Sequence, residues 1–216
     1  MEYSDIIIFI MELVGTIAFA ASGALTGIQR RMDLFGVNVL GVTTAVGGGL
    51  VRDLILGQNP PAMFRDSTYA MTAILTSTIL FICVYISRKS GAGRHMRIYD
   101  ILLLVGDTIG LGIFSVMGSY AAVRAGYAGN RFLIVFVGVI TGVGGGMLRD
   151  IMAGNMPYIL VKHVYAVASL AGALTFVLLI PYTDRITCMF VGAAVVMVIR
   201  FLAAYYRWNL PKIYWT

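Results

Sequence analysis

The sequence contains one glycine-rich motif twice, and each copy ends in an arginine followed by an aspartate. The first copy runs from Thr44 to Asp53, and the second, 97 residues later, runs from Thr141 to Asp150. Three consecutive glycines precede each charged pair: Gly47, Gly48 and Gly49 in the first copy, and Gly144, Gly145 and Gly146 in the second. Glycine lowers helix stability by about 1 kcal/mol relative to alanine and permits conformations that other residues avoid. We therefore predict that each glycine run breaks a helix.

The predicted breaks lie near the middle of two apolar segments, where non-helical backbone must be buried in protein or line a wet cavity. A broken helix offers carbonyl groups to a cation on one side of the break and N–H groups to an anion on the other, so the sign of a bound ion stays open. Thr43, Thr44 and Thr141 could add hydroxyl oxygens. The alternative is that the glycines only allow helices to pack closely, as small residues do in membranes.

The charged pairs are Arg52 with Asp53 and Arg149 with Asp150, several residues beyond the centre of each apolar segment. An isolated charge at that depth costs roughly 3 kcal/mol or more, so each charge needs a partner or water. The simpler interpretation is that arginine reaches the interface while aspartate pairs with it. The functional interpretation is that the pairs stand at the two mouths of a conduction path and gate or tune it.

A second repeated pattern carries one acid in each half of the chain. Glu12 and Asp107 are each followed, at the same spacing, by a glycine, a phenylalanine and a second glycine. The following residues are Gly15, Phe19 and Gly23 in the first half and Gly110, Phe114 and Gly118 in the second. Spacings of three and four place these side chains on one helix face. Both acids could attract cations into a path, although Glu12 could also simply lie at the membrane interface.

The composition predicts the elements that hold these residues. Of the 216 residues, 59% are hydrophobic and 12% are charged, whereas soluble domains carry about 25% charged residues. We predict an all-α integral membrane protein with seven transmembrane helices, because apolar stretches of close to the roughly 20 residues that span a bilayer recur along the chain. The predicted spans are 6–28, 34–56, 67–87, 99–123, 132–154, 163–181 and 186–206.

These spans form one membrane domain, 1–216, in which 6–87 and 99–181 are two repeats and 186–206 is an extra C-terminal helix. Each repeat has three spans, and an odd number of spans reverses the direction of the next copy. The two three-helix repeats are therefore predicted to be inverted relative to each other, an arrangement whose sites tend to lie near the middle of the membrane.

The distribution of basic residues predicts the orientation of a chain whose net charge is +6. One set of loops contains Arg30, Arg31, Arg88, Lys89, Arg94, Arg97, Lys162, Arg207 and Lys212, whereas the opposite set contains Arg65, Arg124, Arg131 and Arg185. By the positive-inside rule the first set is cytoplasmic, which places the N-terminus outside and the C-terminus inside. No basic patch with interleaved aromatic residues points to nucleic acid, so membrane lipids and transported ions are the expected partners.

Neither a metal site nor a catalytic site is predicted. Cys83 and Cys188 lie in predicted spans, and neither they nor His95 and His163 show metal-ligand spacing. No nucleophile stands at a recognisable spacing from a base, and the glycine runs lie within helices rather than after a strand, so they are not phosphate loops. The sequence therefore predicts no cofactor, no structural metal and no enzyme.

The doubled motif resembles that of a known family. Gly-Gly-Gly-x-x-Arg-Asp stands at 47–53 and again at 144–150, with Phe19-x-x-Ser22-Gly23 before the first copy and Tyr165-Ala166 after the second. This pattern resembles the prokaryotic branch of the trimeric intracellular cation channel family, and the resemblance spans essentially the whole chain. It implies a homotrimer of seven-helix subunits, each with its own pore between kinked second and fifth helices, that conducts K⁺ and some Na⁺.

The resemblance also assigns roles to residues of this chain. It makes the two glycine runs the kinks and the two Arg-Asp pairs the pore-associated charges, and it adds Lys162 at the cytoplasmic end of the sixth helix as a weaker candidate. It implies the cell (inner) membrane of a prokaryote. The same family has been described as a permease of small amino acids, so a secondary transporter of a small solute such as glycine stays open as the alternative. A purely structural scaffold would explain the fold but not the charges within it.

Overall fold

The computed structural model describes residues 3–89, 96–161 and 164–208. Within these residues the chain is all-helical, as predicted. The helices are α1 Tyr3–Gln29, α2 Leu34–Ile55, α3 Ala62–Arg65, α4 Thr68–Lys89, α5 Met96–Ala122, α6 Arg131–Met152, α7 Tyr158–Val161, α8 Val164–Leu179 and α9 Arg185–Tyr205, with a π-helical turn, η1 Val123–Tyr127, between α5 and α6.

Among the described helices, six are long and apolar enough to cross a membrane, namely α1, α2, α4, α5, α6 and α9. The predicted span 163–181 contains α8, which has 16 residues and a length of about 24 Å at 1.5 Å per residue. Large apolar side chains such as Leu75, Ile79 and Ile86 of α4 are exposed. Such a surface suits lipid and not water.

Three of the long helices have a polar N-cap residue. The side chains of Asp33, Asn130 and Asp184 accept hydrogen bonds from backbone N–H groups in the first turns of α2, α6 and α9. At Asp184, hydrogen bonds from the side chain and backbone of Thr187 lower the pKa of the carboxyl. These caps satisfy N–H groups that have no partner within the helix.

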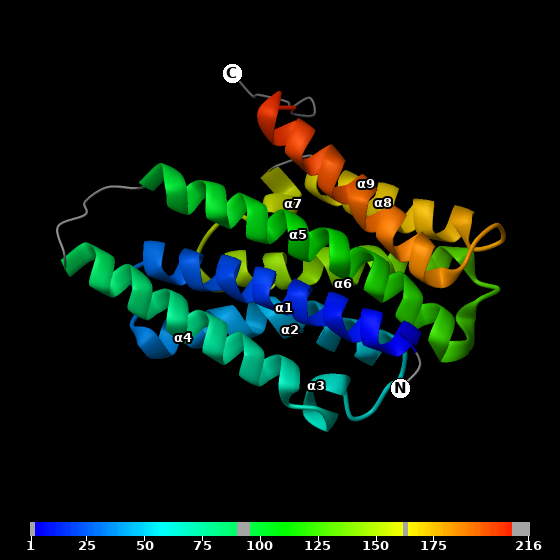
Figure 1. Cartoon of the computed structure of the whole chain (residues 1–216), viewed down its shortest axis with the longest axis horizontal. Helices are drawn as coiled ribbons and strands as arrows, with labels where there is room; N and C mark the ends of the chain where they lie inside the picture. The colour runs from blue at the N-terminus through cyan, green and yellow to red at the C-terminus, as the bar shows by residue number, and fades with distance from the viewer. Residues whose placement is uncertain (1–2, 90–95, 162–163, 209–216) are drawn as a thin grey trace, which may run out of the picture.

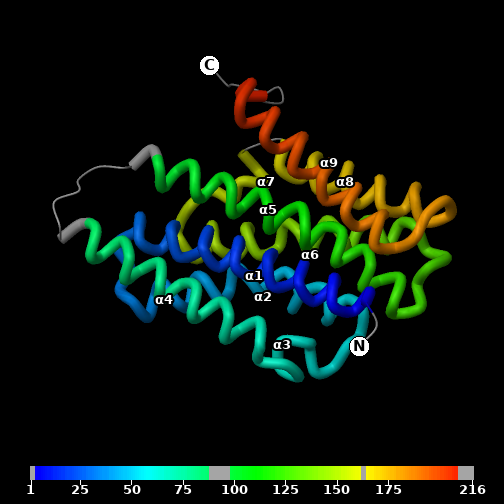
Figure 2. The backbone as a smooth tube through the Cα atoms, in the orientation of Figure 1, coloured from blue at the N-terminus to red at the C-terminus, as the bar shows by residue number. Residues whose placement is uncertain are grey.

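The long helices alternate in direction along the molecule, so that α1 and α5 run antiparallel, as do α2 and α6 (Figure 1). At the centre, α1, α2, α5 and α6 pack against one another. The helix α4 covers α1 and α2, and α8 covers α5 and α6 in the corresponding way. The last helix, α9, packs mainly on α5 and α8 of the second half and also touches α1 (Figure 2).

The predicted helix breaks are wrong. Helix α2 continues through Gly47–Gly49 and α6 through Gly144–Gly146, with helical backbone throughout. A Cβ atom on Gly48 would lie 2.1 Å from the carbonyl oxygen of Thr141, and a Cβ on Gly145 would lie 2.1 Å from the carbonyl oxygen of Thr44. The glycines therefore let the two helix backbones touch, and this packing outweighs their low helix propensity.

The glycines of the second repeated pattern also serve the contact between helices. A Cβ on Gly110 would lie 2.0 Å from the ring of Phe19, and a Cβ on Gly15 would lie 3.2 Å from the ring of Phe114. The two phenylalanine rings are 5.3 Å apart, centre to centre. Each phenylalanine thus packs on the glycine of the other half, which agrees with the predicted common face.

We predict that Gly48→Ala lowers the midpoint of thermal unfolding of the purified protein, whereas Gly49→Ala leaves it unchanged or raises it. The added methyl at position 48 meets backbone that cannot move aside, at a cost of about 1–3 kcal/mol. At position 49 the nearest neighbour of a Cβ is Nη2 of Arg52, at 3.7 Å. Gly49→Ala is a matched control, because both changes replace a glycine of the same helix by alanine. Equal midpoints for the two variants would contradict the close helix contact.

Candidate functional site

Each half of the molecule brings together a carboxylate, an Arg-Asp pair and a tyrosine from its three main helices. These helices are α1, α2 and α4 in the first half and α5, α6 and α8 in the second. In the second half these groups meet at Asp107 of α5. We call Asp107, Arg149, Asp150, Tyr165 and Arg200 the Asp107 cluster. In the first half the corresponding group is Glu12, Arg52, Asp53 and Tyr69, which we call the Glu12 cluster.

The Asp107 cluster is buried and electrically balanced. Nη1 of Arg149 lies 2.8 Å from Oδ1 of Asp107, and Nη2 of Arg200 lies 3.2 Å from its Oδ2. The Asp107 and Arg149 side chains are 0% and 1% exposed. Arg149 also pairs with Asp150. Two arginines thus face two aspartates, which is the condition for keeping charges away from water.

Neutral groups complete the Asp107 cluster. The hydroxyl of Tyr165 donates to Oδ1 of Asp107 at 3.2 Å, and Arg149 donates to the hydroxyl of Ser22 on α1. The guanidinium carbon of Arg200 lies 4.8 Å from the centre of the Tyr165 ring. The cluster therefore ties α1, α5, α6, α8 and α9 together.

The Glu12 cluster repeats this arrangement but is open. Nε of Arg52 lies 2.7 Å from Oδ1 of Asp53, and the hydroxyl of Tyr69 donates to Glu12. Glu12 is partly buried and forms no ion pair with any residue that the structure describes. It lines a cavity of about 210 Å³ together with Gly49, Tyr69 and Phe114.

The charged pairs are fixed by identical turns. Gly57 and Gly154, with φ values of 69° and 66°, end α2 and α6 in the left-handed conformation that glycine favours. The second carboxylate oxygen of each aspartate, Oδ2, accepts a hydrogen bond from a backbone N–H beyond the turn. Asp53 accepts from Ala62 at 2.8 Å, and Asp150 accepts from Tyr158 at 2.9 Å. Each aspartate therefore caps the short helix that follows and holds its neighbouring arginine.

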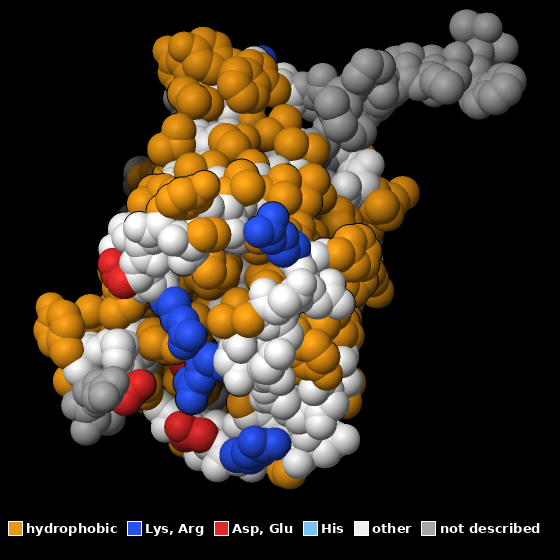
Figure 3. All heavy atoms as spheres, turned by 90° about the vertical axis from the view of Figure 1, so that its right-hand side faces the viewer, with side chains coloured by type: hydrophobic (Ala, Val, Ile, Leu, Met, Phe, Trp, Pro, Cys, Tyr) orange, Lys and Arg blue, Asp and Glu red, His pale blue; other side chains and the backbone are white. Residues whose placement is uncertain are grey.

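Two larger cavities lie at opposite ends of the molecule. One, of about 520 Å³, is lined by Glu12, Arg52, Gln58, Arg65 and Arg124 among others. Figure 3 views the end where α1 and α6 begin and shows Lys and Arg side chains gathered around its middle, with Asp and Glu nearby. This end of the molecule therefore presents charged side chains of both signs around a cavity.

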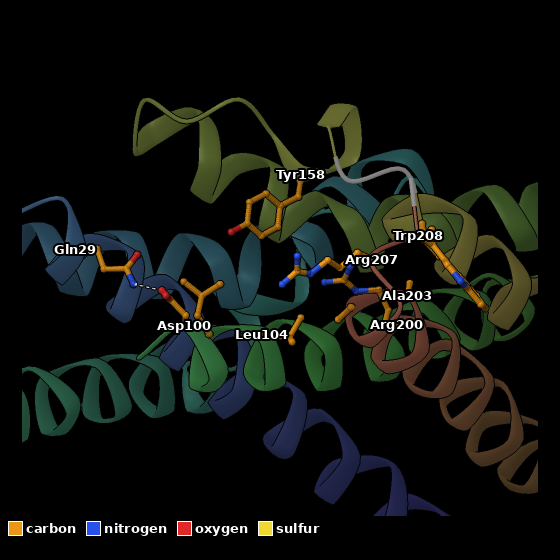
Figure 4. A pocket seen from close by; sticks show the side chains of 11 residues that line it. Gln29, Asp100, Leu104, Tyr158, Arg200, Ala203, Arg207 and Trp208 are labelled. Atoms are coloured by element: carbon orange, nitrogen blue, oxygen red, sulfur yellow. Dashed lines mark hydrogen bonds between the residues drawn. The ribbon is translucent and has the colours of Figure 1, made fainter. Parts of the chain in front are cut away.

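The second cavity, of about 570 Å³, lies near the C-terminal end of α9 and includes Gln29, Asp100, Tyr158, Arg200 and Arg207 in its lining. Figure 4 shows the Arg200 and Arg207 side chains among those that line this cavity and a hydrogen bond from Gln29 to Asp100. This cavity shares no lining residue with the cavities on the Glu12 side. The buried ring of Phe19 packs behind Phe114, which lines the Glu12 cavity.

The structure brings the predicted charges into these two clusters, namely Glu12, Arg52, Asp53, Asp107, Arg149 and Asp150, but neither the glycine runs nor the threonines. The hydroxyls of Thr44 and Thr141 are buried and donate to carbonyls of their own helices, at Leu40 and Val137. Thr43 is partly buried. Lys162 lies outside the described residues. No group of metal-ligating side chains occurs in the ranges that the structure describes.

Sequence reasoning missed Arg200 and Tyr69. Arg200 is a charge within the predicted span 186–206, and an ionisable residue inside a membrane is by itself a reason to expect function. Tyr69 stands 96 residues before Tyr165, an offset between those of the two repeated patterns. Tyr69 becomes visible once the repeat is extended to the third helix of each half, whereas Arg200 has no counterpart in the first half.

Comparison with known proteins agrees with this geometry. A family model described as "Glycine transporter" matches residues 9–85 and 104–181. The UPF0126 inner membrane protein YadS of Escherichia coli (strain K12) is 37% identical over 207 residues, which cover 94% of each chain. The chain belongs to this family of membrane proteins.

Solved structures add the fold of this family. One, described as the structural basis for conductance through TRIC cation channels, has a TM-score of 0.81 and 32% identity and covers 100% of this chain and 99% of that one. A trimeric intracellular cation channel orthologue from Rhodobacter sphaeroides has a TM-score of 0.83 and 29% identity, covering 93% and 98%. The resemblance to the prokaryotic trimeric intracellular cation channels is confirmed.

We predict that Asp107→Asn destabilises the protein by about 3–5 kcal/mol, because it leaves two buried arginines with one carboxylate between them. The same change in the open cluster, Glu12→Gln, is the matched control and should cost much less. Adding Arg200→Met to Asp107→Asn should restore part of the loss, since it removes the surplus charge. Yield and thermal unfolding of the detergent-solubilised protein measure all three. An Asp107→Asn variant as stable as Glu12→Gln would refute the role of the cluster.

Proposed function

We propose that this protein is a channel for monovalent cations, K⁺ and to a lesser extent Na⁺, with a path inside each subunit of a homotrimer. The observation that carries the proposal is its likeness, over nearly the whole chain, to structures described as cation channels and trimeric channels. The path runs between α2 and α6, the second and fifth of the seven proposed membrane spans, and connects the cavities at the two ends.

The contact between α2 and α6 suits a gate. At their crossing the helices touch through backbone atoms at Gly48 and Gly145, and Leu148 of α6 packs against Gly47 of α2. Glycine surfaces of this kind leave few side chains to unpack when two helices separate or slide. In the closed arrangement Phe19 and Phe114 lie between the open Glu12 cluster and the Asp107 cluster, so conduction requires these rings to move.

We propose that α1, α2 and α4 form one three-helix repeat and that α5, α6 and α8 form its inverted copy, with α9 as the seventh span. The alternating helix directions and the two matching clusters support this (Figure 1). We place the chain in the inner membrane of a prokaryote, with the N-terminus outside, because Arg30, Arg31 and Arg207 gather at the other end. Impermeant thiol labelling of a cysteine at Trp208, but not at Gly129, on intact cells would overturn this orientation.

A transporter of a small solute such as glycine is the second candidate, since the matching family model carries the description of a glycine transporter. Inverted repeats serve carriers as well as channels. The two proposals differ in rate and stoichiometry: a channel holds ions weakly and passes many per opening, whereas a carrier moves substrate in cycles that saturate.

We predict that the reconstituted protein in a planar bilayer with a KCl gradient shows discrete unitary steps and a reversal potential near that of K⁺. Asp53→Asn should shift the reversal potential toward that of Cl⁻, because it leaves Arg52 unbalanced beside the path. Silent bilayers combined with saturable glycine uptake into vesicles would favour the transporter. A wild-type reversal potential near that of Cl⁻ would exclude cation selectivity.

A further inference from the structure

The two clusters differ by one positive charge. The Asp107 cluster contains two arginines and two aspartates, so its formal charges cancel. The Glu12 cluster contains Arg52 against Glu12 and Asp53, which leaves one negative charge without an internal partner. The missing group is the counterpart of Arg200, because that residue comes from α9 and the first half has no such helix.

The groups that recognise Arg200 are nevertheless present in the first half. In the second half the guanidinium of Arg200 binds the carboxylate of Asp107 and lies over the ring of Tyr165, whose hydroxyl donates to the same carboxylate. In the first half Tyr69 donates to Glu12 in the same way. Glu12 and Tyr69 both line the cavity of about 210 Å³. The first half therefore has a carboxylate, an aromatic ring and a cavity at the place where the second half holds the guanidinium of Arg200.

We propose that this cavity binds a small organic cation that carries a guanidinium group. The cation pairs with the Glu12 carboxylate and packs against the Tyr69 ring, as Arg200 does with Asp107 and Tyr165. Charge-assisted hydrogen bonds to the carboxylate and attraction to the ring supply the binding energy. A bare alkali ion would make fewer contacts in so large a space.

Other charges face this cavity and limit the affinity. Arg52 lines it but is paired with Asp53. Arg65 and Arg124 are exposed and line the adjoining outer cavity, where water and salt screen them. Added salt should still weaken binding, because it also screens the attraction between the cation and the Glu12 carboxylate.

A bound cation would also stand at the outer end of the proposed path and reduce K⁺ current. This second consequence rests on the proposed channel function, whereas binding itself does not.

The test measures binding of methylguanidinium to the purified trimer by titration calorimetry, with methylurea as the neutral compound of the same shape. Methylguanidinium should bind saturably and methylurea should not. Glu12→Gln should weaken binding by about tenfold or more, since it removes a charged hydrogen-bond acceptor. Asp33→Asn, which removes a distant carboxylate but still caps α2, should bind as the wild type does. If Glu12→Gln cannot be purified, Tyr69→Leu should weaken binding instead.

Equal binding of the two compounds, or binding that neither variant changes, would overturn the proposal. Bilayer recordings separate it from the channel function. Binding at Glu12 without any channel current would leave the site standing and reject the channel. K⁺ current that methylguanidinium does not reduce, together with no calorimetric binding, would reject the site and leave the channel standing.

Discussion

A buried carboxylate held between two arginines is the interaction on which the rest of the structure depends. Asp107 has no exposure and pairs with Arg149 and Arg200. Unpaired, any of these charges would be costly within a membrane, so α5, α6 and α9 must stay together. Ser22 and Tyr165 extend the constraint to α1 and α8. The packing of five helices thus follows from satisfying one acid.

The duplicated halves solve the same problem in two ways. Both hold an arginine against the next aspartate and use that aspartate to cap a short helix. Helix α9 then supplies a second arginine to the second half alone. One side of the molecule is consequently self-contained, while the other presents a carboxylate to a cavity. The second arginine thus makes the duplicated protein asymmetric, because its two ends no longer offer the same charge to an approaching ion.

The sequence predicted the all-helical membrane fold and singled out the charged members of both clusters except Arg200, because glycine and charge patterns are local and occur twice in the sequence. It misjudged the glycine runs, since intrinsic propensity favours a break while the decisive contact comes from a helix almost a hundred residues away. The loops that follow the two Arg-Asp pairs differ in length. The N–H that Asp53 binds follows Pro61, and the one that Asp150 binds follows Pro157, so the first loop is one residue longer. Arg200 was missed because no second copy marks it.

The central claim is that the first half offers an open site for cations while the second half satisfies its acid internally. Crystals grown with Tl⁺ in place of K⁺ test it most directly, because the anomalous scattering of Tl⁺ locates bound monovalent cations. The account predicts a Tl⁺ peak beside the Glu12 carboxylate and none beside Asp107. A peak at Asp107 with Glu12 unoccupied would contradict it.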